Sequence, residues 1–130
     1  MASFDTHHMA AVPDAIAPDG SEVRLLAATG RGSMAHFRLP AGAVSKAVRH
    51  RTVEEVWYFV AGSGEMWRRL GDQEENAVVA PGVSVSIPVG TVFQFRAAAD
   101  GPLEAIAVTM PPWPGADEAV PAEGSWPATV

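Results

Sequence analysis

Two glycine-bounded segments place the tightest constraint on what this chain can fold into. The first runs from Gly42 to Gly62 and reads GAVSKAVRHRTVEEVWYFVAG, and the second runs from Gly82 to Phe93 and reads GVSVSIPVGTVF. Both are rich in the β-branched and aromatic residues that favour strands. Glycine readily takes the backbone conformations that tight turns require. The segments therefore predict short strands joined by tight turns.

The chain from residue 21 to residue 110 continues this pattern. Apolar and polar residues alternate over short runs, and turn signals such as Gly62-Ser63-Gly64 and Gly71-Asp72 separate the runs. A helical period is suggested only over 116–120. The candidate strands are 21–28, 33–39, 55–61, 65–70, 77–80, 83–87, 91–96 and 103–110. Many short strands with regular turns predict an all-β fold, either an antiparallel sandwich or a barrel.

The spacing within the two segments resembles the two signature motifs of the cupin family. The first motif runs Gly, five residues, His, one, His, three or four, Glu, six, Gly, and His50 and Glu55 stand at its second His and its Glu. The second motif runs Gly, five, Pro, one, Gly, two, His, and Pro88 and Gly90 fit it. The resemblance covers about 41–110. It implies a small single-domain cupin, a double-stranded β-helix or jelly-roll barrel that holds a metal or a ligand inside.

Apolar side chains stand at two of the metal-ligand positions of these motifs. The resemblance implies three His and one Glu directed into the barrel, whereas this chain has Val48 and Phe93 in place of two of the His residues. We therefore expect either no cofactor or a weakly bound divalent metal of unknown identity. If a metal is bound, its ligands would be His50, Glu55 and, as a replacement, His36.

His50 and Glu55 are the candidate catalytic residues whether or not a metal is bound. A histidine beside a carboxylate inside an apolar barrel can act as a general acid–base pair, because desolvation and the neighbouring charge tune its pKa. The alternative is a structural role in which His50 only hydrogen-bonds Glu55 or a loop at the barrel mouth.

Alternation along the strand that carries Glu55 also predicts the barrel lining. Trp57 and Phe59 share the parity of Glu55, so all three should face inward. Such a lining suits a flat, largely apolar ligand held by a few polar anchors, although inward aromatic residues can equally be plain core. The candidate ligand-binding residues are His36, Arg38, Trp57, Phe59, Met66, Phe93 and Phe95.

Three functions are consistent with these residues. The preferred hypothesis is a small cupin that binds a small organic molecule, aromatic or polyketide-like, and uses His50 and Glu55 for isomerisation, cyclisation or dehydration. The second is a ligand-binding cupin without catalysis. The third is a metal-dependent isomerase or oxygenase that uses His36 as a replacement ligand. Whether the chain is an enzyme stays open at this point.

Length and composition bound the remaining properties. With 130 residues, the chain should form one domain: an arm over 1–20, a barrel over 21–112, and a tail over 113–130, rich in Pro and Trp, that packs on the barrel or on a partner. A net charge of -6 disfavours a nucleic-acid partner. The uncharged run 77–95 is interrupted by prolines and glycines, which disfavours a membrane span. The start lacks the features of a signal peptide. We expect a cytoplasmic protein and, from the family resemblance, a homodimer.

Overall fold

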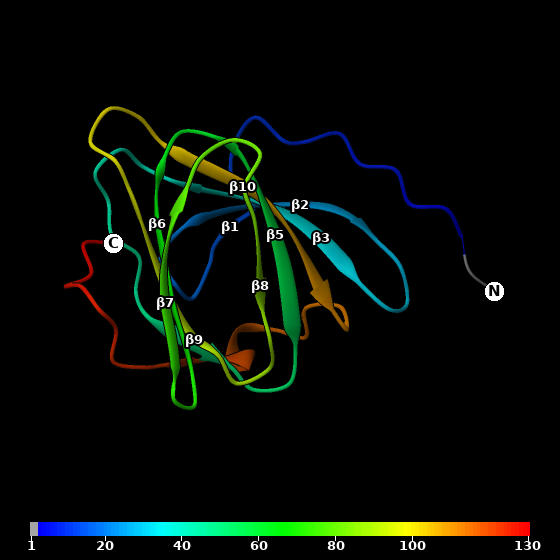
Figure 1. Ribbon diagram of the computed structural model, residues 1–130. Coiled ribbons are helices and arrows are strands. Elements are labelled where there is room, and N and C mark those ends of the chain that lie inside the picture. Colours follow the sequence, from blue (N-terminus) through cyan, green and yellow to red (C-terminus); the bar gives the residue numbers. More distant parts are fainter. Residues whose placement is uncertain (1–2) are drawn as a thin grey trace.

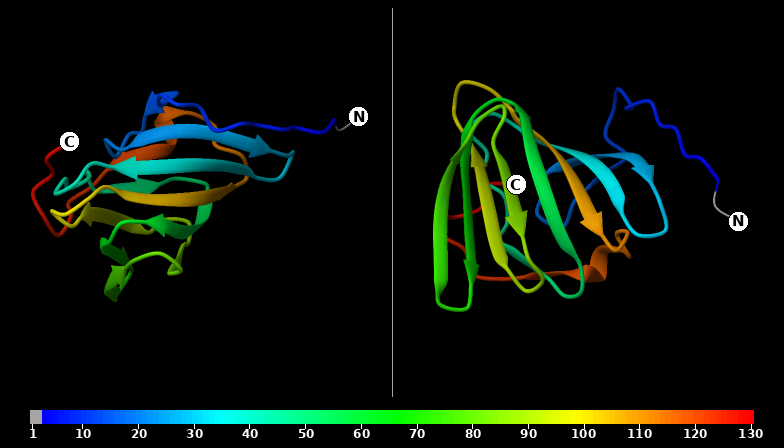
Figure 2. Two further views of the ribbon diagram at one scale, coloured as in Figure 1. Left: turned by 90° about the horizontal axis from the view of Figure 1, so that it is seen from above. Right: turned by 45° about the vertical axis from the view of Figure 1, so that its right-hand side comes forward.

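Two antiparallel sheets face each other in the computed structural model, which describes residues 3–130. Sheet A has six strands in the order β1-β2-β3-β10-β5-β8, and sheet B has five in the order β11-β4-β9-β6-β7. Figures 1 and 2 show β2, β3 and β10 on one side of the barrel and β6, β7 and β9 on the other. The all-β jelly-roll fold predicted from the sequence is confirmed.

The bounds of the longer strands agree with the predicted strands, apart from the first part of one of them. Sheet A comprises β1 (Ala15–Ile16), β2 (Glu22–Ala28), β3 (Ser33–Leu39), β10 (Leu103–Met110), β5 (Glu54–Ala61) and β8 (Ser84–Ile87). Sheet B comprises β11 (Ala119–Pro121), β4 (Val48–His50), β9 (Val92–Ala97), β6 (Gly64–Leu70) and β7 (Gln73–Val79). The pattern missed β1, β4 and β11, which are only two or three residues long, and the first part of β7, where exposed polar residues give no alternation. The helical period near 116–120 is a single 3-10 turn, η1 (Ala116–Glu118).

Gly62, at the turn between β5 and β6, shows why the motif needs glycine at this point. Its φ is +75°, and a Cβ atom at this position would lie 2.0 Å from the carbonyl oxygen of Pro102. Any side chain would therefore clash with the loop before β10 as well as strain the backbone. The glycine allows the hairpin to close against β10 and fixes the register of β5.

A closed apolar core fills the end of the barrel away from the start of β5. Phe59, Met66, Phe95 and Leu103 are each at most 1% exposed and belong to one cluster. Trp57 continues this cluster, with its ring 5.1 Å from that of Phe95 in an edge-on contact. The inward parity predicted for Glu55, Trp57 and Phe59 is confirmed, because all three are at most 3% exposed while the intervening Val56 and Tyr58 are exposed.

The N-terminal arm follows the edge of sheet A. The Asp14 carboxylate accepts a hydrogen bond from the backbone N–H of Leu25, and the Asp5 carboxylate accepts one from that of Ala28. Arg24 donates from its side chain to the carbonyl oxygens of Ala10 and Ala11. These contacts cover the part of β2 that extends beyond the two-residue edge strand β1 and that would otherwise be open to pairing with another chain.

The C-terminal tail wraps the outside of sheet B, as Figure 1 shows in orange and red. The buried Gln94 side chain accepts hydrogen bonds from the backbone N–H groups of Ser125 and Trp126. Arg96 stacks over the Trp126 ring, 4.1 Å from its centroid. Earlier in the tail, β11 pairs with β4 and becomes the edge strand of sheet B. Within residues 3–130, no helix has the length and apolar character needed to cross a membrane.

Candidate functional site

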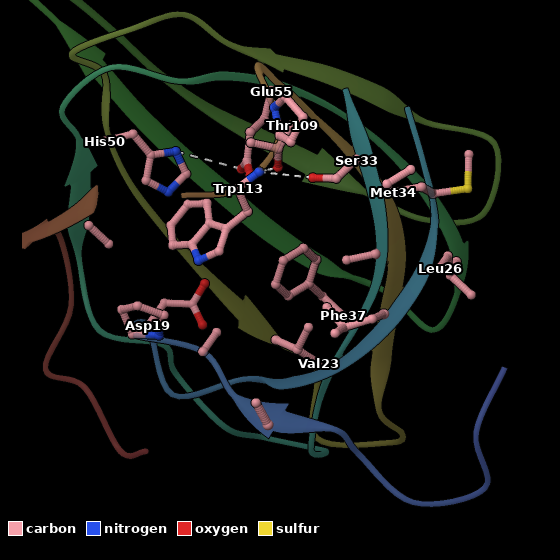
Figure 3. Close-up of a pocket in the computed structure, with 18 of the residues that line it drawn as sticks. Asp19, Val23, Leu26, Ser33, Met34, Phe37, His50, Glu55, Thr109 and Trp113 are labelled. Carbon is pink, nitrogen blue, oxygen red and sulfur yellow. Dashed lines mark hydrogen bonds and ion pairs between the residues drawn. The ribbon is translucent and has the colours of Figure 1, made fainter. Parts of the chain in front are cut away.

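A cavity of about 630 Å³ opens between the two sheets at the end of the barrel where β5 begins. Its wall combines strands from both sheets with the loop before β2 and the segment after β10. Figure 3 shows the side chains that line it. The lining is mostly apolar, and its buried polar side chains include His50, Glu55, Asp19 and Thr109. A cavity of this size and character is typical of a small-molecule site.

His50 and Glu55 meet across this cavity from opposite sheets. His50 ends β4 in sheet B, and Glu55 lies near the start of β5 in sheet A. The imidazole Nδ1 lies 3.8 Å from the Glu55 Oε1, which is too long for a hydrogen bond. Nδ1 is also buried and has no other hydrogen-bond partner among the residues described. An unpartnered buried nitrogen is costly for stability, and such groups are often retained for function.

The Glu55 carboxylate is held firmly on the other side of this gap. Trp57 donates to its Oε1 over 3.0 Å, and the Thr109 hydroxyl donates to its Oε2 over 2.5 Å. Burial raises the pKa of Glu55 more than these two hydrogen bonds lower it. Burial lowers the pKa of His50, against the opposing influence of Glu118 and Asp19. The two pKa values are thus displaced toward each other, which reduces the energy needed to move a proton between the groups.

Asp19 brings a second carboxyl group into the same cavity. It lies in the loop between β1 and β2 and is only 5% exposed. Its Oδ1 accepts hydrogen bonds from the backbone N–H and the hydroxyl of Ser21, over 2.9 and 2.6 Å. Burial raises the pKa of Asp19, the Ser21 hydrogen bonds lower it, and nearby Glu55 raises it further. No hydrogen bond within residues 3–130 reaches the other oxygen, Oδ2, and the side chain points into the cavity in Figure 3.

Aromatic rings surround these polar groups. Trp57 stacks on Phe37 with ring centroids 5.0 Å apart, and its edge meets Phe93. Phe93 and Val48 are paired directly on β9 and β4, so the two apolar replacements in the motifs lie side by side. Both line the cavity together with His50 and Glu55. Trp113, from the segment after β10, packs its edge against His50 and lies between His50 and Asp19 in the view of Figure 3.

A loop contact fixes the backbone around His50. Ala119 in β11 pairs with His50, and the carbonyl oxygen of Glu118 accepts from the N–H of Arg51. The Glu118 carboxylate accepts from the N–H and hydroxyl of Thr52 and from the N–H of Val53. Burial raises the pKa of Glu118, but these hydrogen bonds outweigh it, so that the pKa is lowered overall. A charged Glu118 thus holds the tail against the connection that follows His50.

The predicted site residues fall into three places. His50, Glu55, Trp57 and Phe93 line the cavity as predicted. Phe59, Met66 and Phe95 face inward but belong to the closed core, and they do not line the cavity. His36 and Arg38 lie on the outer face of sheet A. The physical reason is that Phe37, on the opposite parity of β3, turns inward to stack on Trp57.

On that outer face, both residues have partners of their own. His36 lies 2.8 Å from Glu104 through its Nε2, and Arg38 binds Glu22 over 3.2 Å. The prediction that His36 is a replacement metal ligand is therefore wrong. His36 could join His50 and Glu55 around an ion inside the barrel only if β3 exchanged its inward and outward faces.

The sequence interpretation missed three residues of the site. Asp19 lies in a loop where no periodicity exists, and Thr109 looks like any strand threonine. Trp113 stands in the proline-rich tail, where the sequence indicates that it packs on a surface but does not locate that surface. Parity could have indicated Thr109, because Ala105 and Ala107 share its face of β10 and are buried. Nothing local in the sequence points to Asp19.

The donor set does not fit a tightly held metal ion. Among residues 3–130, no group of three or more His, Cys, Asp or Glu side chains is arranged to hold an ion. Only His50 and Glu55 remain of the four ligand positions in the motifs, and Val48 and Phe93 offer no donor atoms. The side chains that remain, His50 and Glu55, can still transfer a proton without an ion.

Sequence comparison assigns the family. Residues 35–109 match the family model of the cupin domain, which covers more than half of the chain. The chain thus belongs to the cupin domain family, as its motif spacing indicated. No curated protein matches its sequence.

Comparison with solved structures agrees with this assignment. CapF, a capsular polysaccharide assembling protein from Staphylococcus aureus, is 18% identical with a TM-score of 0.72, over 92% of this chain and 35% of CapF. An oxalate decarboxylase variant from B. subtilis is 17% identical with a TM-score of 0.70, over 94% of this chain and 32% of that protein. KdgF from Halomonas sp. is 19% identical with a TM-score of 0.61, over 83% of this chain and 93% of KdgF. This chain spans about a third of the length of the CapF and oxalate decarboxylase chains. These likenesses show the fold alone.

Proposed function

We propose that this cupin binds a small, largely apolar organic molecule in the barrel cavity and transfers a proton to or from it through His50, with Glu55 as the partner carboxylate. The reactions that such a pair supports are isomerisation, cyclisation and dehydration, each of which begins with proton transfer at a carbon or an oxygen atom. Solved cupin structures that resemble this chain include a named enzyme, oxalate decarboxylase, which supports an enzymatic role at the level of the fold only.

The observation that carries this proposal is the unpartnered Nδ1 of His50 facing Glu55 across 3.8 Å. A histidine with a purely structural role would be expected to close its bond to the neighbouring carboxylate, as His36 does with Glu104, because an open one costs roughly 1–3 kcal/mol. Here both side chains are almost fully buried, yet the bond stays open at the wall of a cavity. The pair is therefore poised to gain its hydrogen bond when the imidazole becomes charged.

The direction of proton transfer follows from the pKa shifts. Because burial lowers the pKa of His50, the imidazole is neutral near pH 7 and can accept a proton from a bound molecule. The ring nitrogen Nε2 lies on the side of Trp113 in Figure 3, away from Glu55. Protonation at Nε2 would leave Nδ1–H facing the Glu55 carboxylate, which stabilises the imidazolium. The same proton can then return to another atom of the bound molecule.

We further propose that this chemistry requires no metal ion. Two donors leave most of a divalent ion's ligand shell to water, and in the part of the chain that the structure describes no third donor is arranged with His50 and Glu55 to hold an ion. Elemental analysis of protein purified without a polyhistidine tag checks this point. One equivalent of a transition metal that survives dialysis would contradict it.

Hydrogen–deuterium exchange into candidate ligands tests proton transfer directly, whatever the complete reaction is. A panel of ring-bearing ketones, with and without an amino group, is incubated with the protein in D₂O, and deuterium at the carbon next to the carbonyl is followed by NMR. We expect the wild type to accelerate exchange in at least one compound and His50→Gln to slow it by roughly 10²–10⁴-fold. Glu54→Gln is the matched control, because Glu54 lies on the exposed face of the same strand.

Two results would contradict the proposal. One is binding without any exchange by the wild type, which would indicate a ligand-binding cupin without catalysis. The other is equal exchange by the wild type and His50→Gln, which would remove His50 from the reaction.

A further inference from the structure

The cavity is acidic, and no fixed positive charge lines it among the described residues. Its ionisable lining residues are Asp5, His7, Asp19, His50 and Glu55, with neither Lys nor Arg among them. His7 is paired with Asp5 over 3.1 Å, at the side of the cavity formed by the arm. His50 is neutral near pH 7 because burial lowers its pKa. A bound carboxylate or phosphate would find no cation there to offset its desolvation.

Two carboxyl groups face the deep part of the same space. The side chain of Glu55 is 2% exposed, and both of its oxygens already accept hydrogen bonds. Asp19 is 5% exposed and keeps Oδ2 free of hydrogen bonds within the described residues, pointing into the cavity. The Asp19 side chain is thus buried while its Oδ2 stays open toward the cavity, where a donor carried by a ligand can reach it.

The aromatic rings around the carboxyl groups favour the same kind of ligand. Phe37, Trp57, Phe93 and Trp113 all line the cavity. A cation within about 6 Å of such a ring face is stabilised by the ring quadrupole, and more strongly when the site is desolvated. Aromatic walls combined with a carboxylate are the arrangement that recognises organic ammonium groups.

From this combination we propose that the cavity selects an apolar molecule that carries an amine or quaternary ammonium group, with Asp19 as the residue that binds its positive charge. This inference rests on the proposed function, because it takes the same cavity as the ligand site. Ring or chain carbons of the ligand lie against Trp57 and Phe93, and its ammonium group lies by Asp19 and the Trp113 ring. The formal net charge of -6 on the whole chain adds a field that attracts cations.

The proposal also assigns distinct tasks to the two buried carboxyl groups. Asp19 recognises charge, whereas Glu55, already bound by Trp57 and Thr109, serves His50. A substitution at Asp19 should therefore change which ligands bind, and a substitution at Glu55 should mainly change the proton chemistry. Two acidic residues in one cavity with separable effects would be hard to explain by packing alone.

Three probes of nearly equal shape test the charge preference. They are 2-phenylethylamine, 2-phenylethanol and phenylacetate, and calorimetry or the quenching of tryptophan fluorescence gives the affinity of the wild type for each. We expect the amine to bind at least about tenfold more tightly than the alcohol, from the ion pair and the ring contacts together. We expect no measurable binding of phenylacetate. In Asp19→Asn the preference for the amine over the alcohol should fall to about twofold or less, which would leave only the ring contacts.

Controls separate a specific effect from a general loss of charge or of folding. Glu54→Gln removes one negative charge at an exposed position and should leave the preference unchanged. If Asp19→Asn does not fold, the wild type alone still gives the answer through benzyltrimethylammonium, whose charge does not depend on pH. Its affinity should rise with pH as Asp19 and Glu55 lose their protons, because burial raises the pKa of both. Nearby His50 gains positive charge only in acid, so it acts in the same direction, whereas Glu118, whose pKa is lowered, stays ionised and adds a constant attraction.

Each outcome decides between the two proposals. Equal binding of amine and alcohol, or tighter binding of phenylacetate, would overturn the charge preference while leaving the cavity as a ligand site. An unchanged preference in Asp19→Asn would overturn the role of Asp19. Failure of all probes, benzyltrimethylammonium included, would reject the ammonium proposal, and the ketone panel would then decide the proposed function independently.

Discussion

Two histidine–glutamate pairs of this barrel differ in distance and exposure, although each histidine leaves a buried Nδ1 without a hydrogen-bond partner among the described residues. On the outer face of sheet A, His36 reaches Glu104 over 2.8 Å, between the neighbouring strands β3 and β10. In the cavity, His50 and Glu55 are 3.8 Å apart and come from different sheets. The side chain of Glu104 is 26% exposed, whereas that of Glu55 is 2% exposed. The first pair is closed and partly exposed, and the second is open and almost fully buried.

The two distances differ because of where each pair lies in the barrel. Register fixes the distance between side chains on neighbouring strands, so the outer pair has one geometry. A pair that spans two sheets depends on the spacing of the sheets, which a ligand between them can change. Low dielectric in the cavity also makes the charges on the inner pair matter more. Identical residue types thus form a closed hydrogen bond in one place and an open pair at the wall of a cavity in the other.

The largest expected effect is on turnover. His50→Ala should lower the rate by roughly 10²–10⁴-fold once a substrate is in hand, because one positioned proton-transfer group contributes that much. His36→Ala should leave the rate of the folded protein unchanged. Steady-state kinetics on both variants, normalised to the folded fraction from circular dichroism, gives the comparison. A similar loss of rate in both would remove the distinction between the pairs.

Stability should respond in the opposite order. His36→Ala breaks a formed hydrogen bond at a site that is only 3% exposed, and we expect it to lower the free energy of unfolding by about 1–3 kcal/mol. His50→Ala should cost less, because its Nδ1 has no hydrogen bond to lose among the described residues. Urea denaturation followed by fluorescence measures both values. A larger cost at His50 would identify it as a structural residue.

The pH dependence of the free energy of unfolding should reveal the raised pKa of Glu55, the carboxyl group of the inner pair. Because the folded protein raises the pKa of Glu55, the native state holds its proton more tightly than the unfolded chain does. The free energy of unfolding should therefore fall as the pH rises from the unfolded pKa of Glu, about 4.3, to the higher folded value. Glu55→Gln should remove this part of the decline, and Glu104→Gln should not. Equal pH profiles for wild type and Glu55→Gln would show that Glu55 ionises normally.

Burial of His50 acts with the opposite sign. Its folded pKa lies below the ordinary value of about 6.5, so the unfolded chain binds the proton first as the pH falls, and stability is lost on the acid side. Subtracting the His50→Gln profile from that of the wild type isolates this contribution. Glu55 and His50 thus give slopes of opposite sign, the first above about pH 4.3 and the second below about pH 6.5.

The smallest expected effect is at the mouth of the cavity. Trp113 is only half buried, so Trp113→Ala should change the free energy of unfolding by about 1 kcal/mol or less, while it should speed ligand entry by removing the ring beside His50. Stopped-flow binding of an aromatic amine measures the entry rate. Unchanged association and dissociation rates would mean that Trp113 does not border the route.

The sequence predicts the barrel well and the site only in part. Glycine spacing and alternation indicate the fold and the inward row that contains Glu55 and Trp57, because both depend on local backbone geometry. Alternation along β3 groups His36 with Arg38, but it does not say which row faces inward. The apolar row through Phe37 and Leu39 decides that question.

The site residues that the sequence does not predict depend on contacts between distant parts of the chain. Asp19 reaches the cavity because the loop before β2 lies near the segment after β10, and no local pattern encodes that proximity. The same holds for the end of the closed core, where Phe59 and Met66 share the parity of the lining but lie too deep to touch a ligand. Parity gives the face of a strand, and only the packing of both sheets gives the depth.

The segment from Trp113 to β11 contacts both the ring and the backbone of His50. Trp113 touches the His50 ring, and six residues later Ala119 pairs with the His50 backbone, while Glu118 ties Thr52 and Val53 to the same short connection. A ligand that displaced Trp113 would remove its contact with the His50 ring, whereas β11 and Glu118 would still hold the His50 backbone. Access to the cavity and the placement of the imidazole therefore depend on the same short segment of the chain.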